Sequence, residues 1–181
     1  MSFNKDRIFE DSLFPFQNGV NWTEFFNGRA LERYKVGGLS FVDYMLTQCH
    51  AFDVNPKLLV ATLQREQGLI SKRELKAKDL DRATGYGCTD SGDLPGITGF
   101  ERQITGCLRT YRKFFDSWVP KTKMIVDVSA LIMPENRFTY TLYKYCPHIG
   151  VNYSPQFAKY GPYGCFELYR IWRQFWPKDV V

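Results

Sequence analysis

The residue whose type and position point most directly to chemistry is Glu66. The apolar pattern of residues 55–70 has the period of an α-helix, and a helical projection places Glu66 beside Leu59 and Ile70 in the apolar stripe. A carboxylate on a buried face is costly unless a cation pairs with it or a proton neutralises it. Burial would raise the pKa of this group, and a carboxyl group that keeps its proton near neutral pH can act as a general acid, as glycoside cleavage requires. The sequence therefore predicts that Glu66 is a catalytic acid, and that the Glu66→Gln substitution leaves the melting temperature unchanged or raises it.

The same pattern is compatible with a purely structural role for Glu66. In this alternative its carboxylate pairs with a buried arginine, such as Arg102 or Arg109, and holds helices together. In both cases the opposite face of the helix is expected to face solvent, and it consists of Ala61, Gln64, Arg65 and Gly68.

A second carboxyl group would decide how a glycosidic bond is broken. Our candidate is Asp90, in a glycine-rich segment, and the other acidic residues in or beside that segment are Asp81, Asp93 and Glu101. A carboxylate facing Glu66 across about 6.5–9.5 Å could activate a water molecule for hydrolysis with inversion. Without one, a group of the glycan itself can attack, which gives an anhydro product. Each of these acids is also a typical solvated turn residue.

Substrate contacts would come from aromatic and amide side chains near these carboxyl groups. Aromatic rings can stack on sugar rings, and an amide can hydrogen-bond to hydroxyl groups. The candidates are Tyr86, Gln103, Tyr143 and Tyr145. Tyrosines at helical spacing are also typical of a core or its rim, so each candidate has a structural interpretation as well.

A mainly α-helical fold must position these residues. Apolar periodicity together with capping and breaking residues predicts helices over residues 21–33, 40–49, 55–70, 104–118, 134–146 and 165–176. The start at Asn55-Pro56 is clear because asparagine caps a helix and proline suits its first turn. Five glycines and Pro95 make residues 85–99 a loop. Residues 123–132 predict a short hairpin, so the fold class is mainly α with at most a small β-hairpin.

Length, composition and charge narrow the class of protein. A chain of 181 residues is expected to form one domain, 1–181, with residues 1–37 as an N-terminal helical extension packed on it. The net charge of +5 favours an anionic partner, but the basic residues are scattered among acids, which argues against nucleic acid. No apolar run is long enough to cross a bilayer and no signal peptide is evident. We therefore expect a monomer without stable membrane insertion that is cytoplasmic when made.

The cysteines and histidines do not form a metal-binding pattern. The chain has two histidines and five widely spaced cysteines without a CxxC pair: Cys49, Cys88, Cys107, Cys146 and Cys165. This pattern predicts no metal site, no cofactor and reduced thiols.

Four blocks of sequence resemble the lysozyme-like superfamily, which contains soluble lytic transglycosylases and goose-type lysozymes. Val54–Leu69 resembles the catalytic helix of that superfamily, with Glu66-Gln67 at its end, and Ala83–Cys88 occupies the place of the small-residue turn that follows. The likeness is greatest to bacterial domains that share the Gly-Tyr-Gly-Cys block. They also share Gly99-Phe100 with Gln103, and Tyr143–His148. The blocks span roughly residues 38–176.

The resemblance implies a lysozyme-like fold that cleaves the β-1,4 bond between N-acetylmuramic acid and N-acetylglucosamine in peptidoglycan, with Glu66 as general acid. It further implies a phage-type endolysin that acts on the cell wall after release. The chain departs from the transglycosylases, which carry Gly-Leu-Met-Gln where this sequence has Gly85–Cys88 and an Ala-Tyr-Asn motif that residues 140–145 lack. Hydrolysis and transglycosylation therefore both stay open.

Two other functions are compatible with the sequence. A chitinase-like glycosidase would use the same single acid on a related, neutral polymer. A non-catalytic wall-binding or virion structural module would keep the fold, although a binding module has no need for a carboxyl group on an apolar helix face.

Overall fold

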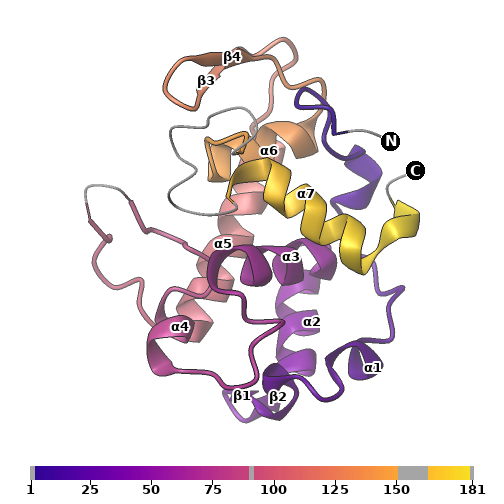
Figure 1. Cartoon of the computed structure of the whole chain (residues 1–181), viewed down its shortest axis with the longest axis vertical. Coiled ribbons are helices and arrows are strands. Elements are labelled where there is room, and N and C mark those ends of the chain that lie inside the picture. The colour runs from indigo at the N-terminus through magenta and orange to yellow at the C-terminus, as the bar shows by residue number, and fades with distance from the viewer. Residues whose placement is uncertain (1–2, 90–91, 151–162, 180–181) are drawn as a thin grey trace. The chain divides into compact units, whose positions relative to one another are not determined.

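The computed structural model describes residues 3–89, 92–150 and 163–179 (Figure 1). These residues form helices connected by loops and two small antiparallel hairpins, so the predicted fold class, mainly α, is confirmed. None of the described helices is long and apolar enough to cross a membrane.

The chain divides into two compact units. Unit 1 comprises Met1–Pro15 and Thr110–Val181, and unit 2 comprises Phe16–Arg109. Helix α5 (Phe100–Asp116) contributes residues to both units. The grouping divides residues 1–37 between the units, and the expectation of one domain with an N-terminal extension stays a prediction.

Unit 2 begins with several short elements connected by turns. Helix α1 (Trp22–Phe26) is followed by a 3-10 turn (Ala30–Arg33), the hairpin β1 (Lys35–Val36)–β2 (Leu39–Ser40), and helix α2 (Phe41–Ala51). The predicted helix over residues 21–33 is interrupted because Gly28 adopts a left-handed conformation with φ of 75°. Gly37 and Gly38, with φ of 58° and 87°, form the turn of the hairpin.

Helix α3 (Pro56–Gln67) carries the predicted catalytic residue and starts where the sequence indicates. The Asn55 side chain caps it by accepting a hydrogen bond from the Lys57 amide at 3.0 Å. Its end comes earlier than residue 70 because Gly68, with φ of 64°, closes it as a left-handed cap. The short helix α4 (Ala77–Asp81), which the periodicity did not predict, follows before the loop that leads to α5.

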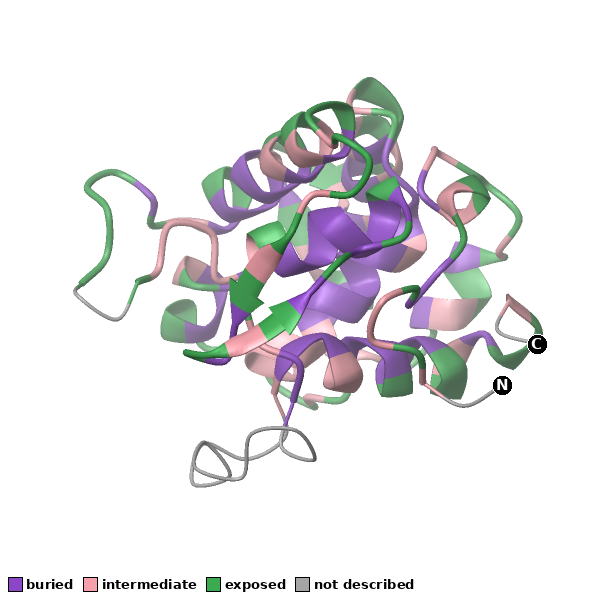
Figure 2. Ribbon diagram, turned by 90° about the horizontal axis from the view of Figure 1, so that it is seen from above, coloured by how far each residue is buried: buried purple, intermediate pink, exposed green. Residues whose placement is uncertain are grey.

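The apolar side chains of α2 and α3 form much of the core of unit 2. Leu58, Leu59, Leu63 and Met45 are all fully buried, and Figure 2 colours buried positions purple. Ala61, which we expected to face solvent, is also fully buried. The solvent-facing side of α3 is therefore narrower than its amphipathic pattern predicts.

Unit 1 contains helices α6 (Arg137–Tyr145) and α7 (Gly164–Phe175), a C-terminal 3-10 turn (Pro177–Asp179), a first 3-10 turn (Asp11–Leu13) and the hairpin β3 (Met124–Val126)–β4 (Ala130–Ile132). This hairpin confirms the one predicted over residues 123–132. Helix α6 starts after Pro134 because the Asn136 side chain caps it, accepting from the Thr139 amide at 3.0 Å. The core is aromatic: the Phe9 ring lies 4.7 Å from Trp172 and 5.2 Å from Phe138.

Candidate active site

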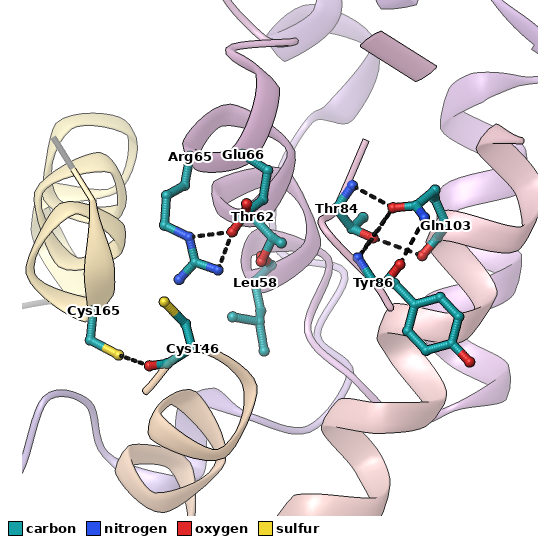
Figure 3. Close-up of polar contacts among 9 residues, drawn as sticks. All are labelled: Leu58, Thr62, Arg65, Glu66, Thr84, Tyr86, Gln103, Cys146 and Cys165. Atoms are coloured by element: carbon teal, nitrogen blue, oxygen red, sulfur yellow. Dashed lines mark hydrogen bonds and ion pairs between the residues drawn. The ribbon is translucent and has the colours of Figure 1, made fainter. Parts of the chain in front are cut away.

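The carboxyl group of Glu66 is held by the neighbouring residue in the chain. Arg65 donates from Nε at 2.8 Å and from Nη2 at 2.5 Å, both to Oε1 of Glu66 (Figure 3). The side chain of Arg65 is 4% exposed and that of Glu66 is 27% exposed. The expectation that Arg65 faces solvent was wrong, and Glu66 is only partly buried on its helix.

The ion pair partly matches the structural alternative for Glu66. That alternative named Arg102 or Arg109 as the partner, whereas the cation in the structure is Arg65. The exposed Arg102 instead donates to the carbonyl of Gly96 at 3.4 Å. Because Arg65 and Glu66 are adjacent on one helix, their pairing orients the carboxyl group without joining two elements.

The second oxygen of Glu66 lies against the backbone of Gly85. A methyl group added at Gly85 would stand 2.9 Å from Oε2, closer than real Cβ atoms approach, and 3.2 Å from the carboxyl carbon, which is tighter than most such contacts. Gly85 also has a φ of 70°, which side chains with a Cβ rarely adopt. A side chain at position 85 would therefore be strained by the backbone conformation and would displace the carboxyl group of Glu66.

Glu66 opens onto a pocket of about 280 Å³ in unit 2. Its lining comes from the end of α3, from the residue after α4 and from the start of the loop: Glu66, Gln67, Arg82, Gly85, Cys88 and Thr89. The sequence did not identify Gln67, Arg82, Cys88 or Thr89 as site residues. The Gly-Tyr-Gly-Cys block gave a signal for part of this lining, because two of its residues, Gly85 and Cys88, line the pocket.

Arg82 connects two residues of the loop on the far side of the pocket. It donates from Nε to the Cys88 sulfur at 3.3 Å and forms an ion pair with Asp93. The pKa of Arg82 is raised by these contacts, with the hydrogen bond to Asp93 as the largest cause. Burial raises the pKa of the Cys88 thiol, although the hydrogen bond from Arg82 acts in the opposite direction.

Gln103 connects the loop to helix α5. Its Oε1 accepts hydrogen bonds from the Thr84 and Tyr86 amides, both at 3.2 Å, and its Nε2 donates to the carbonyls of Tyr86 at 3.0 Å and Ile97 at 2.9 Å (Figure 3). The side chain is fully buried. In this structure Gln103 therefore holds the loop beside Glu66. We had expected its amide to contact a substrate, and in this buried position it cannot do so.

Of the tyrosines selected from the sequence, Tyr86 belongs to the same unit as Glu66, whereas Tyr143 and Tyr145 belong to unit 1. The Tyr86 ring packs on Gly106 of α5, where an added Cβ would overlap it, and Figure 3 shows it turned away from Glu66. In unit 1, Tyr143 is fully buried and donates from its hydroxyl to the Lys5 carbonyl at 3.1 Å. Tyr145 stacks on Tyr111 with ring centroids 4.4 Å apart. In this arrangement Tyr143 is a core residue and cannot stack on a sugar.

The candidates for the second carboxylate differ in their surroundings. Asp90 lies outside the described residues. Asp93 is ion-paired with Arg82, and Glu101 is exposed in the first turn of α5. No group of three or more acidic, cysteine or histidine side chains that could hold a metal ion occurs in the part of the chain that the structure describes.

Comparisons with known proteins give no match, whether the chain is compared with family models, with curated proteins or with solved structures.

Proposed function

We propose that this protein is a lysozyme-like enzyme that cleaves the β-1,4 bond between the two amino sugars of peptidoglycan, with Glu66 as the general acid. The observation that carries the proposal is the arrangement of one carboxyl group. Arg65 holds Oε1, while Oε2 lies beside Gly85 at a pocket that is open to solvent. A proton donor for a glycosidic oxygen needs this combination of fixed orientation and access for a polymer.

In the proposed reaction, Oε2 of Glu66 gives its proton to the oxygen that leaves the sugar. Arg65 holds Oε1 through two hydrogen bonds, and the backbone of Gly85 permits close approach because it has no side chain. A water molecule activated by a second carboxylate would then give hydrolysis, and attack by the glycan's own group would give the anhydro sugar. Asp90 stays the candidate for that second carboxylate.

A second hollow in unit 2 favours peptidoglycan over chitin as the substrate. This pocket, of about 520 Å³, is lined by Arg29, Arg33 and Arg73, with a single acidic residue, Glu74. Arg33 and Arg73 are both exposed and both line this hollow. Among the described residues, neither has an ion-pair partner. Guanidinium groups recognise carboxylates, which the lactyl and peptide groups of peptidoglycan carry and neutral chitin lacks.

The decisive experiment is Glu66→Gln, which keeps the shape and removes the proton donor. We expect lysis of purified cell walls, followed as a fall in turbidity, to drop by about 10²–10⁴-fold. Because the substitution replaces the acidic group that accepts two hydrogen bonds from the buried Arg65 with a neutral amide, we now also expect the free energy of unfolding to fall by about 1–3 kcal/mol. This replaces the expectation of unchanged or higher stability. Glu24→Gln, on an exposed carboxylate of α1 in unit 2, is the matched control and should lyse walls at the parental rate.

Parental lysis by the Glu66→Gln variant would remove Glu66 from the mechanism. If that variant unfolds, the double substitution Arg65→Met with Glu66→Gln removes both charges and restores a neutral pair of side chains. A folded double variant with full activity would then support the structural alternative. Mass spectrometry of the muropeptides from the parent distinguishes reducing ends from anhydro ends, and so separates hydrolysis from transglycosylation.

The arginine-lined hollow gives a test of the substrate class. Arg33→Gln with Arg73→Gln should lower the rate on cell walls about tenfold, because each charged hydrogen bond typically contributes about 1.5–3 kcal/mol before solvent screening. The rate on neutral chitin oligomers should stay at whatever value the parent has. Equal losses on both substrates would show that the hollow does not select a charged polymer.

A further inference from the structure

Exposed apolar side chains are concentrated on one small segment of unit 1. Of the seven large hydrophobic residues that are exposed in the described part of the chain, five fall between residues 119 and 133. We call them the hairpin surface: Val119, Ile125, Val128, Leu131 and Met133, with exposed fractions of 62%, 67%, 79%, 60% and 46%. Apolar residues gathered in this way on a surface mark an interaction site, whereas single ones are ordinary.

The hairpin β3–β4 gives this surface its form. Val126 and Ile132 are 1% exposed and face inward, whereas Ile125 and Leu131 are directly paired across the strands and face outward. Figure 1 shows the hairpin at the edge of unit 1 beyond α6, and Figure 2 colours its outward positions as exposed. The outer face of such a hairpin normally carries polar residues, and this one carries an aliphatic pair.

The tip of the hairpin keeps an apolar side chain at a conformational cost. Val128 has a φ of 75°, a region where a β-branched residue is an outlier and where glycine or asparagine is favoured. Its side chain is 79% exposed, so burial within the protein does not compensate for the strain. The residue type at this turn is therefore better explained by a contact outside the chain than by the stability of the hairpin.

Asp127 holds the base of this tip in place. Its Oδ2 accepts from the Ile149 amide at 2.8 Å, its Oδ1 lies 3.0 Å from Nδ1 of His148, and its own amide donates to the Pro147 carbonyl at 3.0 Å. The Asp127 side chain is 1% exposed. The hairpin surface is therefore presented by an anchored turn.

The exposed charges that directly precede β3 are positive. Lys121 and Lys123 are exposed, and Asp127 at the turn is buried. After β4, the carboxylate of Glu135 is exposed as well, and it lies 4.0 Å from the guanidinium group of Arg7, which offsets its charge. An apolar tip flanked by exposed lysines is complementary to the interface of a bilayer with anionic headgroups, where side chains enter the headgroup boundary and lysines meet the negative surface. We propose that the hairpin surface binds the interface of an anionic lipid bilayer. This contact is peripheral, spans no membrane and is independent of the proposed glycosidase activity.

The test is sedimentation of the full chain with vesicles at about 0.1 M salt. The parent should bind vesicles that contain phosphatidylglycerol and bind phosphatidylcholine vesicles more weakly, because the two lysines add attraction only to the anionic surface. Ile125→Ser with Leu131→Ser should weaken binding roughly tenfold or more, since two aliphatic side chains are removed from the contact. Leu94→Ser, which changes a residue that is 55% exposed in unit 2, is the matched control and should bind as the parent does.

Val128→Gly separates a binding role from a structural one. Glycine relieves the strain at φ of 75°, so the melting temperature should stay or rise, while vesicle binding should weaken. Unchanged binding by this variant, or equal binding of the parent to the two lipids, would overturn the proposal. It would also be overturned if the parent binds no vesicles and sediments as a dimer that Ile125→Ser with Leu131→Ser converts to a monomer, because the surface would then fit a second copy of this chain.

Discussion

At the scale of single residues, the position of the Glu66 carboxyl group depends on two neighbours of opposite kinds. Arg65 donates two hydrogen bonds to Oε1. Gly85 has no Cβ atom, and this leaves the space in which Oε2 lies. Because Gly85 has no side chain, Oε2 keeps its place at the pocket, where a proton donor must be accessible to the substrate.

The first prediction concerns Gly85→Ala. The new methyl group would meet Oε2 of Glu66 at 2.9 Å, so we expect the carboxyl group to be displaced and wall lysis to fall by about 10²-fold or more. Gly96→Ala is the control, because Gly96 has a similar φ of 75° with no atom within 4 Å of an added Cβ. Both variants should lose about 1–2 kcal/mol of unfolding free energy, measured by denaturant titration. Similar activity of the two variants would mean that the approach to Glu66 is unimportant.

At the scale of elements, Gln103 determines how the loop after α4 attaches to α5. One amide side chain satisfies donors and acceptors of three loop residues, Thr84, Tyr86 and Ile97. A loop that contains left-handed glycines at 85, 87, 92, 96 and 99 has few conformational restraints of its own. Its order near Glu66 therefore depends on this buried amide.

The second prediction concerns Gln103→Leu, which keeps the approximate volume and removes every hydrogen bond. Because buried backbone groups would lose their partners, we expect the free energy of unfolding to fall by about 2–4 kcal/mol. Amide hydrogen exchange should become faster at Thr84 and Tyr86, because the backbone amides of these two residues donate hydrogen bonds to Gln103. Arg102→Gln, at the exposed neighbouring position, should leave both quantities near the parental values. Unchanged exchange in the Gln103 variant would contradict the role of this residue as the attachment of the loop.

At the scale of the whole molecule, neither compact unit contains a disulfide, because all five cysteines are free. Each of the five cysteines carries a thiol, and burial raises the pKa of the Cys49 thiol far above its ordinary value and that of Cys88 to a lesser degree. A raised pKa leaves little reactive thiolate near neutral pH. The apolar area buried in aromatic clusters such as that around Phe9 and Trp172 stabilises the fold, whereas smaller secreted domains with little core rely on disulfides.

The third prediction is that a reducing agent changes neither the melting temperature nor the rate of wall lysis. The comparison is made on protein purified without reductant and then measured with and without it. Loss of a native disulfide would typically cost about 2–5 kcal/mol. A fall of many degrees on reduction would therefore show that a disulfide forms in the protein, and would also contradict the expected cytoplasmic origin.

The amino-acid sequence by itself determined the features that depend on a few adjacent residues. Ser40 with Asp43, and Asn55 with Pro56, mark the starts of α2 and α3, because a cap is formed by side chains within one helical turn. The glycines of 85–99 mark a loop, and residues 123–132 mark a hairpin, for similarly local reasons. Glu66 could be selected as a candidate catalytic residue for the same reason. It lies on one helix together with the apolar residues that flank it in a helical projection.

Only the tertiary structure decided which side chains are buried and what they contact. Arg65 was assigned to solvent because its helix projection points away from the apolar stripe, yet its side chain is 4% exposed. Gln103 was chosen as a substrate contact, but the loop that it binds begins nineteen residues earlier, at Thr84. Helical periodicity describes one element at a time, whereas burial and hydrogen bonding depend on which other segments cover that element. That information is distributed over distant residues, so the partners of Glu66 and the attachment of its loop emerged only once the chain was folded.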